Sequence, residues 1–224
     1  MILGVQREEM RLLAEVGHSS KKMNPRTIGR VFVGAVREAD AWGSFFVTHV
    51  PGRIGIFGRR LYFRAKLGHL GPRLYSEVGV DIRGWAGVKL DASVFLFRGC
   101  MLSAEAGKCS IGDGSAVGRH AIIDGSGGEI QIGRNVMIAG NVVVRASNHR
   151  FADSGRPMQL QGHEPGRIII EDDVWIGAHC VILSGVTIGK GCVVAANSTV
   201  VKDIPQGMVV GGNPAEIIRD RHNP

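Results

Sequence analysis

The chain has 224 residues and a formal net charge of +7, with 44% hydrophobic and 21% charged residues. This balance excludes a disordered chain, which would be poorer in Val, Ile and Leu. Glycine is abundant at 33 residues while aromatic residues make up only 6%, and no collagen-like triplet is present, so many short strands joined by tight corners are expected rather than a helical bundle.

The positive charge is concentrated in one segment. Between Arg53 and Arg73 the chain has six basic residues and no acidic residue. One basic segment favours a single anionic partner or a membrane surface. No motif typical of nucleic-acid binding accompanies it, so no nucleic-acid partner is expected.

The four cysteines and the N-terminal residues indicate the compartment. Cys100, Cys109, Cys180 and Cys192 show no CxxC spacing, which predicts buried free thiols in a reducing environment. The N-terminus has charges where a signal peptide needs its apolar run, and no stretch approaches 18 apolar residues. We therefore expect a cytoplasmic protein, which could also associate with the inner face of the membrane.

Residues 1–77 lack a repeat and are expected to form a basic, partly helical N-terminal extension. Val5 to Val16 predicts a short helix, and residues 53–67 predict a basic amphipathic helix. This helix could cap the open end of the following domain or contact a membrane or anionic acceptor, and the two roles are compatible. One face would present Arg53, Arg60 and Arg64, and another Ile54, Phe57, Leu61 and Ala65.

Within residues 78–212, several runs of the chain place an aliphatic residue at every sixth position. Neither a helix, with a period of 3.6, nor a strand, with a period of 2, produces this spacing. Three hexads that form the three sides of a triangular coil do produce it, with the aliphatic residue inside and parallel strands stacked coil on coil. The repeat runs through Ile170, Ile176, Ile182, Ile188, Val194 and Val200; Ile132, Ile138 and Val144; Ile111, Val117 and Ile123; and, more faintly, Val88, Val94 and Cys100.

The repeat breaks after Val144 and resumes at Ile170. The polar insertion between them predicts a protruding loop over residues 146–169, and long loops inside compact repeats are usually functional. After Val210 the register ends. Asn213-Pro214 marks a turn, and residues 213–224 predict a tail with a short C-terminal helix.

The stretch from Ile132 to Arg219 contains IGRNVMIAGNVVV, SNH, EDDVWIGAHCVILSGVTIGKGCVVAANSTVVKDIP and GGNPAEIIR. Through these motifs it resembles the hexapeptide-repeat, left-handed β-helix acyltransferases, and among them the galactoside and maltose O-acetyltransferases and the polysaccharide O-acetyltransferases. The resemblance implies an all-β, left-handed parallel β-helix and a homotrimer with active sites between neighbouring coils. It also implies acetyl-CoA as the donor of an acetyl group to a hydroxyl or amine.

The resemblance further implies roles for individual residues. His149 matches the catalytic histidine that opens the protruding loop, and Trp175 matches the tryptophan beside the thioester arm. Ala196 matches a position whose backbone contacts the cofactor. Lys202 and Arg219 match basic residues near the phosphates and adenine end of CoA.

The chain also departs from the sugar acetyltransferases. Ala178, a cofactor-contacting position, stands where they usually have serine, and Glu216 stands where they often have arginine. Arg119 and His120 fall near their acceptor-binding asparagine, whereas their N-terminal acceptor-binding segment is missing. A sugar within a surface polysaccharide, or a precursor of one, therefore fits better as acceptor than galactoside or maltose.

Acetyl transfer to an alcohol needs a base, which His149 can supply because an imidazole titrates near working pH. Asp153 and Glu164, in the same loop, are the candidate carboxylates that orient this base, and the sequence does not choose between them. Asn141 and Asn148 could donate amide hydrogen bonds to the oxyanion or the acceptor, although Asn141 fits better as a corner residue with positive φ.

Two other functions share this fold. A zinc-dependent hydratase of the γ carbonic anhydrase class would need two histidines five residues apart, and no pair among the eight histidines has that spacing, so no metal is expected. A non-catalytic trimeric scaffold would use the coil for assembly alone and would tolerate loss of the loop.

Overall fold

The computed structural model of the protein describes residues 25–223. These residues fall into two compact units that divide between Gly43 and Ser44. The first unit contains most of helix α2 (Pro25–His49), and the second contains the end of α2, helix α3 (Gly52–Lys66) and the strands. Helix α3 confirms the helix predicted over residues 53–67, whereas the helix expected over Val5 to Val16 lies outside the described residues. Within residues 25–223, no helix combines the length and apolar character that a bilayer span requires.

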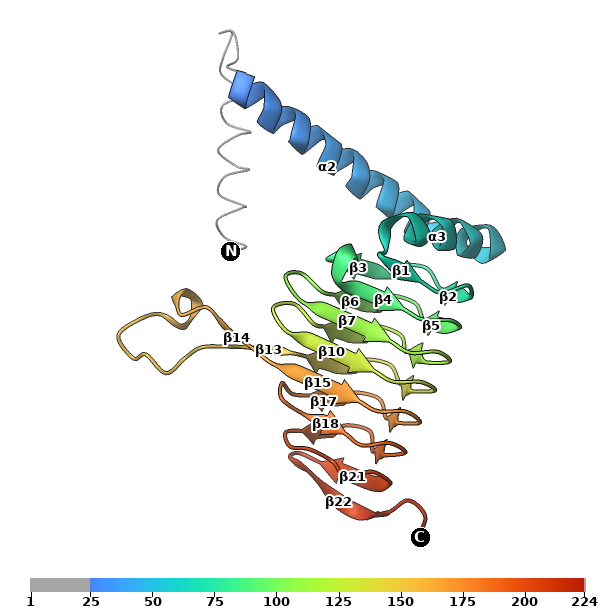
Figure 1. Cartoon of the computed structure of the whole chain (residues 1–224), viewed down its shortest axis with the longest axis vertical. Coiled ribbons are helices and arrows are strands. Elements are labelled where there is room, and N and C mark those ends of the chain that lie inside the picture. Colours follow the sequence, from blue (N-terminus) through green and yellow to red (C-terminus); the bar gives the residue numbers. More distant parts are fainter. Residues whose placement is uncertain (1–24, 224) are drawn as a thin grey trace. The chain divides into compact units, whose positions relative to one another are not determined.

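The second unit is a parallel β-helix with three flat sides, as the hexads predict (Figure 1). Sheet A consists of β1 (His69–Leu70), β4 (Val88–Leu90), β7 (Lys108–Ile111), β10 (Glu129–Ile132), β15 (Arg167–Ile170) and β18 (Thr187–Ile188). Sheet B consists of β2 (Leu74–Ser76), β5 (Val94–Leu96), β8 (Ala116–Val117), β11 (Met137–Ile138), β16 (Trp175–Ile176), β19 (Val193–Val194), β21 (Met208–Gly212) and β22 (Ala215–Asp220). Sheet C consists of β3 (Asp81–Arg83), β6 (Met101–Ser103), β9 (Ile122–Asp124), β12 (Val143–Arg145), β17 (Val181–Ile182) and β20 (Thr199–Val200). The paired strands thus begin at His69, upstream of residue 78.

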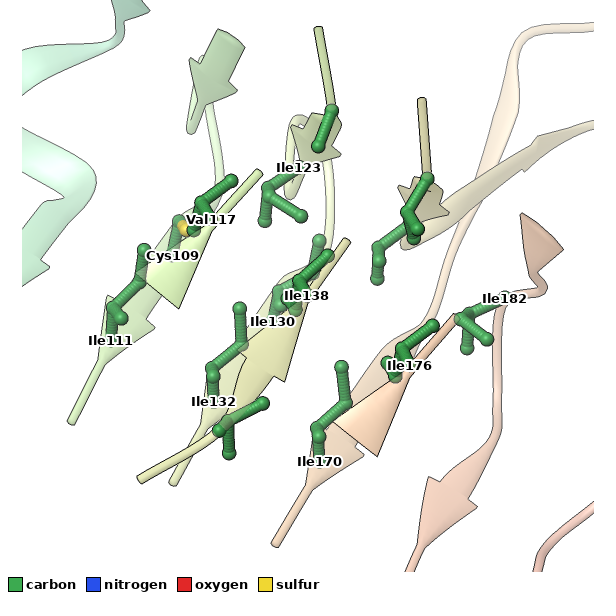
Figure 2. Packing of buried hydrophobic residues seen from close by; sticks show 14 of the residues in the cluster. Cys109, Ile111, Val117, Ile123, Ile130, Ile132, Ile138, Ile170, Ile176 and Ile182 are labelled. Atoms are coloured by element: carbon green, nitrogen blue, oxygen red, sulfur yellow. The ribbon is translucent and has the colours of Figure 1, made fainter. Parts of the chain in front are cut away.

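The core consists of the hexad residues stacked in register from coil to coil. In sheet A, Ile111 pairs with Ile132 and Ile132 with Ile170, and equivalent ladders run through sheets B and C (Figure 2). Burying one such aliphatic side chain contributes about 1.5–3 kcal/mol. Every hexad residue named from the sequence is buried, with at most 4% of its surface exposed.

Residues with positive φ turn the corner between sheets B and C. Four of them occupy the same place in successive coils, with φ between 56° and 62°, and each backbone N–H donates to a carbonyl of the preceding coil. Asparagine and histidine tolerate this left-handed conformation better than most residues. These corner residues are His120, Asn141, His179 and Asn197.

Helix α3 packs on the first coil through Arg59 and Phe63, both buried. The Arg59 Nε donates to the carbonyl of Ser76 in β2 at 3.0 Å, and its Nη1 donates to the carbonyl of Val50 at 2.7 Å. The Phe63 ring lies 5.6 Å from the ring of Trp85. The hydrophobic and hydrogen-bonded face of α3 is therefore turned toward the β-helix.

The prediction of a short C-terminal helix within residues 213–224 is wrong. Ala215–Asp220 forms strand β22, which runs antiparallel to β21. The last strand of a sheet has unpaired N–H and C=O groups along its edge, and a returning strand satisfies them. This pairing outweighs the weak local helix propensity of a six-residue segment.

Candidate active site

The insertion in the repeat forms an antiparallel ribbon. Strand β13 (Ser147–His149) pairs with β14 (His163–Pro165), and the 3-10 turn η2 (Met158–Leu160) lies in the segment between them. The ribbon leaves the β-helix after β12 of sheet C and returns to β15 of sheet A, so it projects from the corner between these two sheets (Figure 1). At its base, the Ser184 hydroxyl donates to the carbonyl of Ala146 at 2.8 Å and ties the ribbon to the next coil.

His149 lies at the end of β13, directly opposite His163. The two ring centroids are 4.0 Å apart, and the ring planes are tilted by 41°. The pKa of His163 is lowered from its ordinary value because the surrounding chain partly desolvates this exposed ring and because charge on His149 and Arg145 opposes protonation. These effects favour the neutral form of the His163 imidazole beside His149.

The alternation of side chains along the ribbon separates Glu164 from His149. Asn148 lies opposite Glu164, and His149 lies opposite His163. Consecutive residues of a strand point to opposite faces, so the Asn148–Glu164 pair and the histidine pair occupy different faces of the ribbon. Glu164 is thus not stacked on the His149 ring.

An open hollow of about 490 Å³ lies on the ribbon, with His149, Asp153 and Glu164 among its lining residues. The Asp153 Oδ1 accepts a hydrogen bond from the Gly155 N–H at 2.9 Å, and its backbone is held by two hydrogen bonds with the Gln161 side chain. Within the described residues, neither carboxylate forms a hydrogen bond with His149. The hollow is also lined by Arg150, Phe151, Ala152, Arg156 and Gln161.

The predicted cofactor-contacting residues gather on another side of the β-helix. Trp175 is in β16 of sheet B with half of its surface exposed. Ala178 and Ala196 follow at the corner between sheets B and C, in successive coils, where the Asn197 N–H donates to the Ala178 carbonyl at 2.8 Å. Ala178 and Ala196 therefore lie at a different corner of the prism from the ribbon that carries His149, and Trp175 lies on the flat side formed by sheet B.

Gly177 shows how closely the coils approach at this corner. A Cβ atom at this position would lie 2.5 Å from the backbone nitrogen and 2.8 Å from the Cα of Ala196. A side chain is therefore excluded at residue 177, and the backbone of Ala196 lies directly against the preceding coil.

Lys202 and Arg219 are both exposed near the end of the β-helix. The Lys202 Nζ lies 3.0 Å and 3.1 Å from the two carboxylate oxygens of Glu216. Glu216 is the residue that replaces the arginine frequent in the sugar acetyltransferases, so this departure gives Lys202 a local partner. The Arg219 Nη1 donates to the carbonyl of Asp220 at 3.1 Å, in β22.

The predicted acceptor residues are divided between the two regions. Asn148 is exposed on the ribbon. His120 and Asn141 are corner residues with φ of 56° and 57°, one coil apart, between sheets B and C. The conformation of Asn141 agrees with the corner role that its sequence context favours.

A larger hollow, of about 1100 Å³, lies over the first coils and contains none of the predicted site residues. Burial raises the pKa of Cys109 to about 12, and the carboxylate of Glu129 is 3.4 Å from Arg167. The predicted acid–base residues His149, Asp153 and Glu164 thus lie on the ribbon and not at this hollow.

The cysteines are all buried and free, as predicted. Burial raises the pKa of Cys100, like that of Cys109, to about 12. Across residues 25–223, no cluster of three or more His, Cys, Asp or Glu side chains is suitably placed to hold a metal ion.

His163 is the residue at this site that the sequence interpretation missed. It lies 14 positions after His149 in the same insertion. The signal that could have identified it is the near-symmetric arrangement of the insertion, with SNH at its start and HEP near its end. An antiparallel ribbon places these two histidines opposite each other.

Comparison with known proteins supports this description. Residues 167–202 match the bacterial transferase hexapeptide family (six repeats). A 2,3,4,5-tetrahydropyridine-2,6-dicarboxylate N-acetyltransferase from Clostridium perfringens is 69% identical over 51 residues, which are 23% of this chain and 22% of that protein. The chain spans about half the length, or less, of the first curated relatives that it matches.

Two solved structures share the fold. A hexapeptide-repeat acetyltransferase from Vibrio cholerae, complexed with acetyl-coenzyme A, has a TM-score of 0.56 and 26% identity and covers 84% of this chain and 88% of its own. The N-acyltransferase AntD from Bacillus cereus, complexed with dTDP-4-amino-4,6-dideoxyglucose and coenzyme A, has a TM-score of 0.61 and 23% identity over 73% of this chain and 89% of its own. In its repeat over residues 167–202 and in its three-sided parallel β-helix, this chain is similar to hexapeptide-repeat acetyltransferases.

Proposed function

We propose that this protein is an acyltransferase that moves an acetyl group from acetyl-CoA to a hydroxyl or amine of a sugar, with His149 as the general base. The observation that carries the proposal is the position of His149 on a ribbon that interrupts the hexapeptide repeat. The Vibrio cholerae relative, which binds acetyl-CoA on the same fold, supports the choice of donor.

In the proposed reaction, His149 accepts the proton of the acceptor O–H or N–H as the acceptor atom attacks the thioester carbon. The resulting tetrahedral intermediate carries its negative charge on the former carbonyl oxygen. Asn141 and Asn148 are the proposed amide donors to this oxyanion or to the acceptor. When the C–S bond breaks, the imidazolium returns its proton to the CoA thiolate, so no net proton is gained by the protein.

One carboxylate of the ribbon is proposed to orient the His149 ring. Asp153 and Glu164 are the two candidates because both line the hollow that contains His149. Both are proposed equally, because neither forms a hydrogen bond with His149 within the described residues and both line the same hollow. Replacing each in turn, as Asp153→Asn and Glu164→Gln, distinguishes them by the loss in kcat.

We propose a homotrimer, because Trp175, Ala178 and Ala196 are on a different edge of the protomer from His149. In a cyclic trimer, the ribbon of one subunit would meet sheet B of the next. The thioester arm would lie beside Trp175 and the backbone of Ala196, and the CoA phosphates near Lys202 and Arg219.

The proposed acceptor is a sugar of a surface polysaccharide or of its precursor, handled at the cytoplasmic face of the membrane. The sugar nucleotide bound by AntD on the same fold supports this class. The amine acceptor implied by the name of the Clostridium perfringens relative makes N-acetylation the second possibility to be tested.

The test is release of CoA thiol from acetyl-CoA in the presence of nucleotide sugars and oligosaccharides. His149→Ala is expected to lower kcat by about 10²- to 10⁴-fold, with unchanged acetyl-CoA affinity. The matched control is His69→Ala, because His69 is an exposed histidine in sheet A, paired with Asp91 at 3.5 Å, and this variant should keep full activity. Full activity in His149→Ala would disprove the role of His149 as general base. Treatment of the product with mild alkali distinguishes an O-acetyl ester, which is hydrolysed, from an amide, which is not.

A further inference from the structure

Helix α3 exposes a row of large apolar side chains on the face that points away from the first coil. Ile54, Phe57 and Leu61 expose 82%, 64% and 53% of their surfaces. Their spacing of three and four residues places them on one side of the helix. We call these three residues the α3 stripe.

The orientation of the stripe is set by the opposite face of the helix. Arg59 and Phe63 are almost completely buried, and Arg59 is bonded to the carbonyls of Ser76 and Val50. A rotation that buried the stripe would break these hydrogen bonds, leave the carbonyls of Ser76 and Val50 without their donor and expose the Phe63 side chain to water, which is unfavourable. The stripe therefore faces outward as a consequence of the packing of α3.

Basic residues border the stripe along one flank. Arg53, Arg60 and Arg64 are spaced by seven and four residues, so they form a second row beside it. Arg53 and Arg64 are exposed, and Arg60 donates to the carbonyl of Pro72. The chain has no acidic residue between Asp40 and Glu77, so this surface has no local counter-charge from that segment.

We propose that the α3 stripe docks on an anionic membrane surface, with the apolar side chains at the boundary between headgroups and acyl chains and the arginines at the level of the lipid phosphates. An apolar row flanked by arginines is complementary to such a surface. Two copies of the helix packed stripe to stripe would instead bring their arginine rows close together without acidic partners. At 15 residues, α3 is shorter than the ~20 residues of a membrane span, so it lies in the membrane plane.

The experiment is flotation of the full chain with phosphatidylcholine vesicles that contain or lack phosphatidylserine. Binding is expected to the phosphatidylserine vesicles at low salt, and high salt should release the protein. Phe57→Ser should weaken this binding about tenfold because a large apolar side chain is lost from the interface. Arg64→Gln should weaken it about fivefold.

The matched control is Phe151→Ser, which removes a phenylalanine with 70% of its surface exposed from the ribbon and should leave vesicle binding unchanged. An unchanged melting temperature verifies that each variant is folded. Equal binding to both vesicle types, no binding, or equal losses in both serine variants would overturn the proposal. So would concentration-dependent self-association that Phe57→Ser abolishes without an effect on vesicle binding, which would assign the stripe to contacts between copies.

Discussion

Mixed trimers can test whether each active site is shared between two subunits. His149 belongs to the ribbon between sheets C and A, whereas Trp175 is in sheet B. If a site combines the ribbon of one subunit with sheet B of the next, a His149→Ala subunit and a Trp175→Ala subunit can together form an intact site. Neither variant alone can do so.

The expected magnitude follows from the arrangement of a cyclic trimer. In randomly mixed trimers made from equal amounts of the two variants, half of the subunits supply an intact His149 and half supply an intact Trp175. About one quarter of the sites then combine the two intact residues. A site contained within one protomer would give no intact sites at all.

The assay is thiol release from acetyl-CoA by the two variants before and after they are unfolded together and refolded. Activity should rise from the residual level of the single variants to about a quarter of the wild-type value. The control is an equal mixture of wild type with the variant that carries both substitutions. Sites shared between subunits would leave about a quarter of the wild-type activity, whereas sites within one subunit would leave about half. A refolded trimer that gains no activity over its parents would refute the shared site.

Two further predictions concern the packing of the coils and the ionisation of the ribbon. Gly177→Ala should lower the free energy of unfolding by about 1–3 kcal/mol, because the new Cβ would meet the Ala196 backbone. Gly58→Ala should raise the free energy of unfolding by up to about 1 kcal/mol. Gly58 is in the interior of α3, and no atom lies within 4 Å of the position of its new Cβ. Denaturant titration measures both free energies of unfolding. Equal destabilisation by the two substitutions would contradict the close approach of the coils at Gly177. The pKa of His163 should lie below 6.5, and His149→Ala should raise it because a neighbouring charge is removed. Nuclear magnetic resonance titration of the imidazole proton measures the shift, and an unchanged pKa would exclude coupling between the rings.

The hexads allowed the β-helix to be predicted because the interior of a triangular coil imposes a strict requirement. Each side admits an inward aliphatic residue at a fixed position, so Ile170, Ile176 and Ile182 mark successive sides of the prism. This signal depends only on the spacing of residues along the sequence, so it can be recognised without knowledge of contacts between distant residues.

Features that depend on distant contacts could not be predicted in the same way. Strand β22 forms because β21 offers an unpaired edge, and nothing in the sequence from Ala215 to Asp220 indicates that edge. The contact between His149 and His163 depends on the register of the ribbon. Helix α3 has apolar residues on two faces, and the burial of Arg59 decides which face is turned inward.

The same strand β22 also limits how the column can grow. Stacked parallel strands end in an open edge that could accept a strand from another molecule, and repetition of that event would produce a fibre. By folding back antiparallel on β21, strand β22 covers the parallel edge of sheet B and becomes an antiparallel edge strand, which cannot continue the coil. Truncation before Ala215 should therefore expose the parallel edge of β21 and promote association through that edge, which light scattering would detect.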